Sequence, residues 1–190
     1  MYRYDKEGVN MELVIPKLED YWYEEKLESD PDTMSYNAGY DVSYPGYHYD
    51  TGCIDFPKEK WIDTYQKRID ENKFFAYIKV DDKYVGYVNY QYNKNLDRYE
   101  CGVLIEYKYR GLGYSKKSLE LLIKEAYKNN IEYLYDAFEK DREKTLNLFL
   151  SVGFEIVEEK IWNKFNKQVD GVVVRVKTKD IYDSRRKPKH

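Results

Sequence analysis

A glycine-containing turn joins a strand pattern to a helix pattern in the middle of the chain. Residues 99–105 have the apolar composition of a strand, and residues 113–129 carry apolar side chains at helical spacing. Gly111 and Gly113 lie between them. A helix whose first turn is glycine-rich offers unpaired N–H groups and the positive end of its dipole to an anion. The turn therefore predicts a cradle for a phosphate-bearing ligand.

Two common phosphate motifs compete for the same residues. A Walker loop needs a lysine and a hydroxyl residue after a longer glycine spacing, and the chain has no such string. The dinucleotide fingerprint requires a third glycine, where Lys116 stands. The strands before the turn also have a hairpin pattern instead of a crossover unit. Both motifs are therefore excluded.

The order of predicted elements defines the fold class. Strands are expected at residues 11–15, 74–80, 83–92, 99–105, 131–138, 153–157 and 171–176, and helices at residues 18–27, 55–69, 113–129 and 141–150. Asp141 is expected to cap the last helix, and Gly153 to follow its end. Residues 29–56 have no clear period and form a long structured loop. This order indicates an α/β (α+β) fold with a mixed, mostly antiparallel sheet flanked by helices.

Length and charge narrow the function classes. The 190 residues with a formal net charge of -3 predict one domain over residues 1–183 and a polar tail at 184–190. No basic stripe points to nucleic acid and no apolar run to a membrane, so we expect a cytoplasmic protein. Cys53 and Cys101 have neither metal-site nor disulfide spacing, so no metal is implied.

Several segments resemble the GNAT superfamily of N-acetyltransferases. Residues 110–115, Arg-Gly-Leu-Gly-Tyr-Ser, resemble its acyl-CoA loop, R/Q-x-x-G-x-G/A. Residues 100–102, 119–127 and 145–154 are similar to the subgroup of ribosomal-protein N-terminal acetyltransferases. The resemblance extends over residues 74–157, and it implies the GNAT fold with acetyl-CoA as co-substrate.

The resemblance also assigns site residues. It implies that acetyl-CoA is held by Val103, Leu104, Ile105, Arg110, Gly111, Leu112, Gly113, Tyr114, Ser115 and Arg142. Glu100 is the candidate general base, and Thr145 and Tyr135 are alternative general acids. Three positions depart from the family pattern. Ser115 replaces a small Gly or Ala, Phe149 replaces a tyrosine acid, and Arg142 replaces an asparagine. These departures leave a second reading open, a non-catalytic acyl-CoA-binding module.

The tyrosine-rich segment at residues 36–50 occupies the place that lines the acceptor side in the family. Aromatic walls with carboxylates suit a cationic amine. The candidate acceptor contacts are Tyr40, Asp41, Tyr47, His48 and Tyr49. We therefore expect a primary amine on a small molecule in preference to a protein amino terminus. A non-enzymatic surface that binds peptide or polysaccharide is a third reading, and strands after Gly153 leave homodimer pairing open.

Overall fold

The computed structural model describes residues 4–6, 9–164 and 167–184. Within these residues, eight strands form one sheet in the order β1-β2-β3-β4-β5-β6-β8-β7. Neighbouring strands are antiparallel except β5 and β6, which are parallel. The strands are β1 (Tyr4–Lys6), β2 (Val9–Val14), β3 (Phe74–Val80), β4 (Lys83–Asn93), β5 (Arg98–Ile105), β6 (Tyr133–Glu139), β7 (Glu155–Lys164) and β8 (Lys167–Lys177). The predicted mixed, mostly antiparallel sheet is confirmed.

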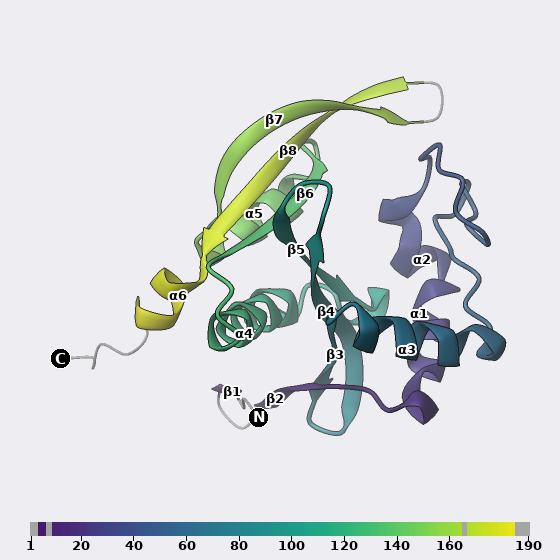
Figure 1. Ribbon diagram of the computed structural model, residues 1–190, viewed down its shortest axis with the longest axis horizontal. Coiled ribbons are helices and arrows are strands. Elements are labelled where there is room, and N and C mark those ends of the chain that lie inside the picture. Colours follow the sequence, from purple (N-terminus) through teal and green to yellow (C-terminus); the bar gives the residue numbers. More distant parts are fainter. Residues whose placement is uncertain (1–3, 7–8, 165–166, 185–190) are drawn as a thin grey trace.

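Helices cover both faces of the sheet (Figure 1). On one side lie α4 (Tyr114–Lys128), α5 (Glu143–Val152) and α6 (Thr178–Ser184). On the other side lie α1 (Trp22–Glu28), α2 (Pro31–Met34) and α3 (Trp61–Asp70). Short 3₁₀ turns precede α1 and α3, follow α2, and join β5 to α4; they are Leu18–Asp20, Lys58–Lys60, Ser35–Asn37 and Tyr107–Tyr109. Among the described residues, no helix is both long enough and apolar enough to cross a bilayer.

Two buried clusters follow from these two layers. The larger one packs the apolar stripe of α4, including Leu119 and Leu122, against the sheet. Cys101 and Ile105 of β5 belong to it. The smaller cluster joins α1 and α2 to the opposite face and contains Leu104. Because side chains alternate along a strand, β5 contributes to both cores, and a ligand between β5 and β6 meets both layers.

The sequence missed several local features. The long loop contains α2 and a 3₁₀ turn, and its Asp30 side chain accepts from the Asp32 N–H at 3.2 Å as an N-cap. Asp141 does not cap α5. Its backbone carbonyl accepts from the Glu143 N–H at 2.9 Å, and Arg142 is the N-cap residue. The predicted tail begins inside α6, which ends at Ser184, while residues 185–190 lie outside the described residues.

The β7–β8 hairpin is longer than predicted. It arches toward residues 36–50, called here the tyrosine-rich loop (Figure 1). Its polar residues 158–160 lack an apolar strand pattern because both faces of this edge strand are largely exposed. Lys164 near its tip pairs with Tyr40 of the loop, and its ammonium lies 2.6 Å from Glu139. The hairpin thus holds the loop close to the end of β6.

Candidate functional site

The site begins where β5 and β6 part. The antiparallel ladder of β4 and β5 extends over eight residue pairs, whereas β5 and β6 share the pair Glu100–Tyr135. In the described residues no other ladder pair joins β5 to β6. The edge of residues 102–105 that faces β6 therefore keeps backbone N–H and C=O groups free of the sheet, and a polar ligand can bind them.

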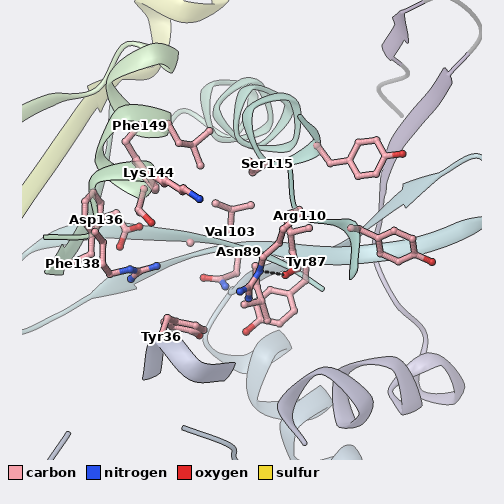
Figure 2. Close-up of a pocket in the computed structure, with 18 of the residues that line it drawn as sticks. Tyr36, Tyr87, Asn89, Val103, Arg110, Ser115, Asp136, Phe138, Lys144 and Phe149 are labelled. Carbon is pink, nitrogen blue, oxygen red and sulfur yellow. Dashed lines mark hydrogen bonds between the residues drawn. The ribbon is translucent and has the colours of Figure 1, made fainter. Parts of the chain in front are cut away.

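A cavity of about 550 Å³ occupies this divergence, a size typical of ligand sites. Figure 2 shows Val103 and Asn89 at its centre, with Asp136, Phe138 and Lys144 opposite Arg110. The lining consists of Tyr36, Tyr87, Asn89, Gly102, Val103, Leu104, Ile105, Tyr109, Arg110, Gly111, Tyr114, Ser115, Asp136, Ala137, Phe138, Arg142, Lys144, Thr145, Leu148 and Phe149. Residues from the sheet, α4, α5 and the tyrosine-rich loop thus meet at one place.

The glycine turn forms an open cradle at the start of α4. Gly113 is the N-cap residue with φ 82°, and Gly111 has φ 80°. Both angles lie in the left-handed region that favours glycine. A Cβ built on either residue would meet no atom within 4 Å. The space above the N–H groups is thus free for a ligand, and the residues present fit the pyrophosphate of acetyl-CoA.

Arg110 connects the cradle to α2. Its guanidinium donates to the carbonyl oxygens of Thr33 at 2.7 Å, Ile105 at 3.1 Å and Asp32 at 3.4 Å. Burial and the nearby Arg142 charge lower the pKa of Arg110 from its ordinary value. The Arg110 guanidinium therefore holds the α2 end and the β5 end together, and it borders the cavity from that position.

Asp136 is a carboxyl inside the cavity that the sequence did not single out as a site residue. It follows Tyr135 directly, at the point where the strands part. Burial raises the pKa of Asp136 to about 7, although the Ala137 N–H, which donates to it at 2.7 Å, and Arg142 favour the charged form. Near neutral pH this carboxyl is therefore able both to accept and to donate a proton.

Asp136 lies near Phe149, the residue that stands where the family pattern has a tyrosine acid. In a strand, residues two apart share a face, so Asp136 and Phe138 point the same way. The Phe138 ring lies 5.2 Å from the ring of Phe149, centroid to centroid. Phe149 itself is buried and lines the cavity. A titratable group thus lies close to the place where the family pattern has its acid.

The opposite wall is aromatic and polar. Tyr87 and Asn89 of β4 point to the α1 side, because they pair with Leu104 and Gly102 of β5. The Arg142 guanidinium lies 5.3 Å from the centre of the Tyr36 ring. Burial raises the pKa of Tyr36 to about 12, so its hydroxyl stays protonated at neutral pH. This wall offers ring faces and neutral hydroxyls to a ligand.

Of the three predicted catalytic residues, one lines the cavity and two lie outside its lining. Thr145 lines the cavity, but Glu100 and Tyr135 lie outside its lining. Glu100 accepts from the Arg98 guanidinium and from the Asn93 amide, each at 2.9 Å. The Arg98 guanidinium also lies 4.9 Å from the centre of the Tyr135 ring. The structure therefore places Glu100 and Tyr135 at the pair that closes the sheet, adjacent to the cavity.

Of the predicted acyl-CoA contacts, Val103, Leu104, Ile105, Arg110, Gly111, Tyr114, Ser115 and Arg142 line the cavity. Gly113 borders it as the N-cap of α4, and the side chain of Leu112 is exposed. The structure thus brings the glycine turn, the β5 edge and the start of α5 to one place.

The five predicted acceptor contacts lie outside the lining, which takes Tyr36 alone from residues 36–50. The Tyr40 hydroxyl donates to Glu139 at 2.5 Å, and the Tyr47 hydroxyl donates to the Asn37 carbonyl at 2.6 Å. His48 Nε2 lies 2.8 Å from Asp55 Oδ1, on the surface. Asp41 and Tyr49 are exposed. The Tyr47 hydroxyl thus holds the loop together, and the Tyr40 hydroxyl ties it to the end of β6.

Sequence reasoning overlooked Tyr87, Asn89, Asp136 and Lys144 as lining residues, and it placed Tyr36 only within the acceptor-side segment at residues 36–50. The signal for Asp136 was a charged residue within an apolar strand pattern, residues 131–138. No comparable signal marked Tyr87, because it is one of four tyrosines in β4.

Comparisons with known proteins agree with this geometry. The family model described as "Acetyltransferase (GNAT) family" matches residues 18–154. No curated protein sequence matches the chain significantly.

Solved structures show the same fold at low identity. A spermidine N-acetyltransferase from Vibrio cholerae, in complex with CoA and spermine, has TM-score 0.72 and 15% identity over 90% of this chain and 98% of its own. A ribosomal-protein-alanine N-acetyltransferase from Brucella melitensis has TM-score 0.69 and 16% identity over 88% and 98%. The protein yncA from Salmonella typhimurium, solved with its cofactor acetyl-CoA, has TM-score 0.68 and 16% identity over 89% and 94%.

Proposed function

The chain belongs to the GNAT family of acetyltransferases, and from this premise we propose that it transfers the acetyl group of acetyl-CoA to a primary amine of a small cationic molecule. One observation carries the proposal. The open glycine cradle at the start of α4 and the divergence of β5 from β6 border the same cavity. A ligand with a phosphate group at one end and a reactive thioester at the other would contact both.

The backbone supplies most of the acetyl-CoA contacts in this proposal. The first N–H groups of α4, with Gly111, Leu112, Gly113 and the Ser115 hydroxyl, would hold the pyrophosphate. The exposed edge of Val103, Leu104 and Ile105 would bind the pantetheine amides and the thioester oxygen. Tyr114, Arg110 and Arg142 would border the arm. Acetyl-CoA supplies the activated acetyl group, and these residues place it against the acceptor.

We assign the proton transfer of the chemical step to Asp136, in place of Glu100. The Asp136 carboxyl lies in the cavity, whereas Glu100 is held outside it by Arg98. As the amine nitrogen bonds to the acetyl carbon, the carboxylate takes one proton from nitrogen. It then returns that proton to the departing thiolate, so the carboxylate is regenerated. Thr145, which also lines the cavity, is the second proton-donor candidate.

The walls support a small cationic acceptor. The Tyr36 and Tyr87 rings offer faces to an ammonium group, and the Asp136 carboxylate offers a counter-charge. The cavity has about 550 Å³ for the acetyl-bearing arm and the acceptor together. This volume favours a small amine over a folded protein segment, although acetyltransferases of both kinds are among the structural neighbours.

The proposal also includes a cytoplasmic location and the pairing of two copies of the chain. Cys53 and Cys101 are free and buried, which supports a reducing, cytoplasmic setting. The edge strand β7 exposes Ile156, Val157 and Ile161. These exposed apolar groups on an unpaired edge support pairing between two copies of the chain.

The test is amine-dependent release of CoA thiol. The protein with acetyl-CoA is screened against polyamines, aminoglycosides and peptides with free amino termini. We expect release with a polyamine or aminoglycoside and none with the peptides. Release with the peptides alone would reassign the acceptor class. Binding of acetyl-CoA with no release for any amine would favour the non-catalytic module.

A further inference from the structure

Resting on the acetyl transfer proposed above, we propose that Glu28, acting through the Tyr87 hydroxyl, removes the first proton of the acceptor's ammonium group and passes it to solvent. Glu28 is the last residue of α1 and lies outside the lining of the large cavity. It would therefore be a proton-relay residue that acts through Tyr87, without direct contact to the reacting atoms.

The Glu28 carboxyl is buried and incompletely bonded. The residue is 8% exposed, and its Oε1 accepts from the Tyr87 hydroxyl at 3.4 Å. Its Oε2 is buried and has no hydrogen-bond partner. A buried carboxylate oxygen without a partner costs free energy that folding alone gives no reason to keep. An oxygen that receives a proton during turnover accounts for this arrangement.

The Tyr87 hydroxyl connects Glu28 to the large cavity. Tyr87 lines the cavity on the acceptor side, next to Asn89 (Figure 2). The Tyr87 hydroxyl donates to Glu28, and its oxygen can accept a proton from a ligand while it gives its own proton to Glu28.

On its far side, Glu28 lines a second cavity of about 200 Å³ between α1, α3 and the loop. Tyr44 at this cavity is 60% exposed, and the Asp55 side chain is 61% exposed. The cavity is therefore continuous with the surface at these residues. Glu28 stands between the two cavities, with its hydrogen bond directed to one and its place in the lining of the other.

The charged groups around Glu28 help to set its pKa, which lies near neutral pH. Glu24 is held by Arg68, whose guanidinium donates to its two oxygens at 2.6 and 2.9 Å. Burial and the Glu24 charge raise the pKa of Glu28 to about 7, while the Tyr87 hydrogen bond and Arg68 oppose the rise. Tyr36 also faces Glu28 from the loop. Asp55, Lys60, Lys67 and Lys73 share the second cavity.

The proton count requires such a route. An alkylammonium acceptor loses two protons when it becomes an amide. One leaves before the nitrogen lone pair can attack, and the other ends on the CoA thiol. In our assignment Asp136 handles the second proton within the cavity. For the first, an N–H bond breaks, Tyr87 oxygen gains that proton, the Tyr87 hydroxyl proton moves to Glu28, and Glu28 releases it to water.

The test compares two forms of one acceptor in Glu28→Gln and Tyr87→Phe. One form is the alkylamine found in the thiol-release screen. The other is an analogue with fluorine beside the amine, which lowers the amine pKa so that it is neutral near pH 7. We expect kcat/KM for the alkylamine to fall about 100-fold, the lower range of general-base effects. For the neutral analogue, kcat/KM should change less than about threefold.

Further readouts separate a relay from a packing defect. The double variant should be no slower than either single variant, because both changes interrupt one path. Added imidazole should restore part of the Glu28→Gln rate through the second cavity. Matched controls are Glu25→Gln on the same helix and Tyr84→Phe on the same strand, which should retain the wild-type rate. Equal losses with both acceptor forms, or additive losses in the double variant, would overturn the relay.

Failure of the relay differs from failure of the proposed function. If the wild type releases no thiol with any amine, the acetyl transfer and the relay both fall. If the wild type is active and Tyr87→Phe shows the wild-type rate and pH profile with the alkylamine, the relay alone falls. The rate of Tyr87→Phe therefore tests the relay even if Glu28→Gln folds poorly.

Discussion

Glu100 and Tyr135 form the ladder pair that joins β5 to β6, and the large cavity opens directly beyond them. Arg98 contacts both residues, with a hydrogen bond to Glu100 at 2.9 Å and its guanidinium 4.9 Å from the centre of the Tyr135 ring. The pair therefore fixes where the strands part. It also fixes the position of Asp136, the next residue along β6, at the start of the opening.

Asp136→Asn should remove proton transfer while leaving acetyl-CoA binding intact. We expect kcat to fall by about 100-fold or more. In the wild type, the pKa of Asp136 is raised to about 7, so the active carboxylate forms as pH rises through 7. The rate should rise over the same interval, and the variant should lose the part of that rise that Asp136 contributes, while the part from Glu28, whose pKa is also raised to about 7, remains. Steady-state kinetics over a pH series measure both effects.

The control for this variant is Asp141→Asn, an exposed carboxyl just before α5. It should retain the wild-type rate and pH profile. An Asp136→Asn protein with unchanged kcat would return the proton-transfer role to Thr145 or Glu100.

Arg110→Ala should lower stability as well as acetyl-CoA affinity. Its guanidinium donates to three carbonyl oxygens and joins α2 to the end of β5. Loss of these hydrogen bonds should reduce the free energy of unfolding by about 2 kcal/mol. Urea denaturation measures this change. A variant with wild-type stability and weakened acetyl-CoA binding would instead indicate a direct ligand contact.

Glu28→Gln should stabilise the protein at alkaline pH. Burial raises the pKa of Glu28 from 4.5 to about 7, so between these values the folded state binds a proton that the unfolded state has released. Wild-type stability therefore falls as pH rises through this window and stays lower above it. Glutamine carries no charge, so the variant should be more stable at about pH 8, by on the order of 3 kcal/mol.

Wild-type protein and Glu28→Gln should have equal stability at about pH 4, where Glu28 is protonated in the folded and in the unfolded state. Urea denaturation at the two pH values gives the comparison, with Glu25→Gln as the control. Equal stabilities at about pH 8 would show that Glu28 ionises without the cost of burial.

Cys101→Ala should keep acetyl transfer within about twofold of the wild type. The thiol is 6% exposed, and burial raises the pKa of Cys101 well above its ordinary value, which disfavours the nucleophilic thiolate. Intact-mass spectrometry after mixing with acetyl-CoA should show no acetylated protein. A stable mass increase that Cys101→Ala abolishes would instead indicate a covalent intermediate.

The fold was largely readable because its core strands and helices carry strong apolar periodicity. Phe74–Val80 and Lys83–Asn93 flank a two-residue turn, and α4 has one apolar face. The outer part of β7 was not readable, since an edge strand exposed on both faces needs no apolar pattern. The Asp141 cap failed because the chain begins α5 one residue later.

The backbone part of the site was easier to predict than its side-chain part. Gly111 and Gly113 mark a turn whose positive φ angles few other residues adopt, so these two glycines alone predict the cradle. Asp136, Tyr87 and Glu28 lie in separate segments that only the tertiary fold brings together. Their proton affinities depend on burial, which the local sequence does not encode.

Calorimetric titration of acetyl-CoA into wild-type protein, Gly113→Glu and Gly39→Glu tests whether the glycine cradle binds acetyl-CoA. Gly113 and Gly39 have similar φ angles, 82° and 84°, but Gly39 lies in the tyrosine-rich loop outside the cavity lining. We expect binding by the wild type and by Gly39→Glu, and loss of binding in Gly113→Glu, whose carboxylate would fill the cradle. Wild-type protein that does not bind acetyl-CoA, or Gly113→Glu that binds it as tightly, would contradict the claim that this cavity is the acetyl-CoA site.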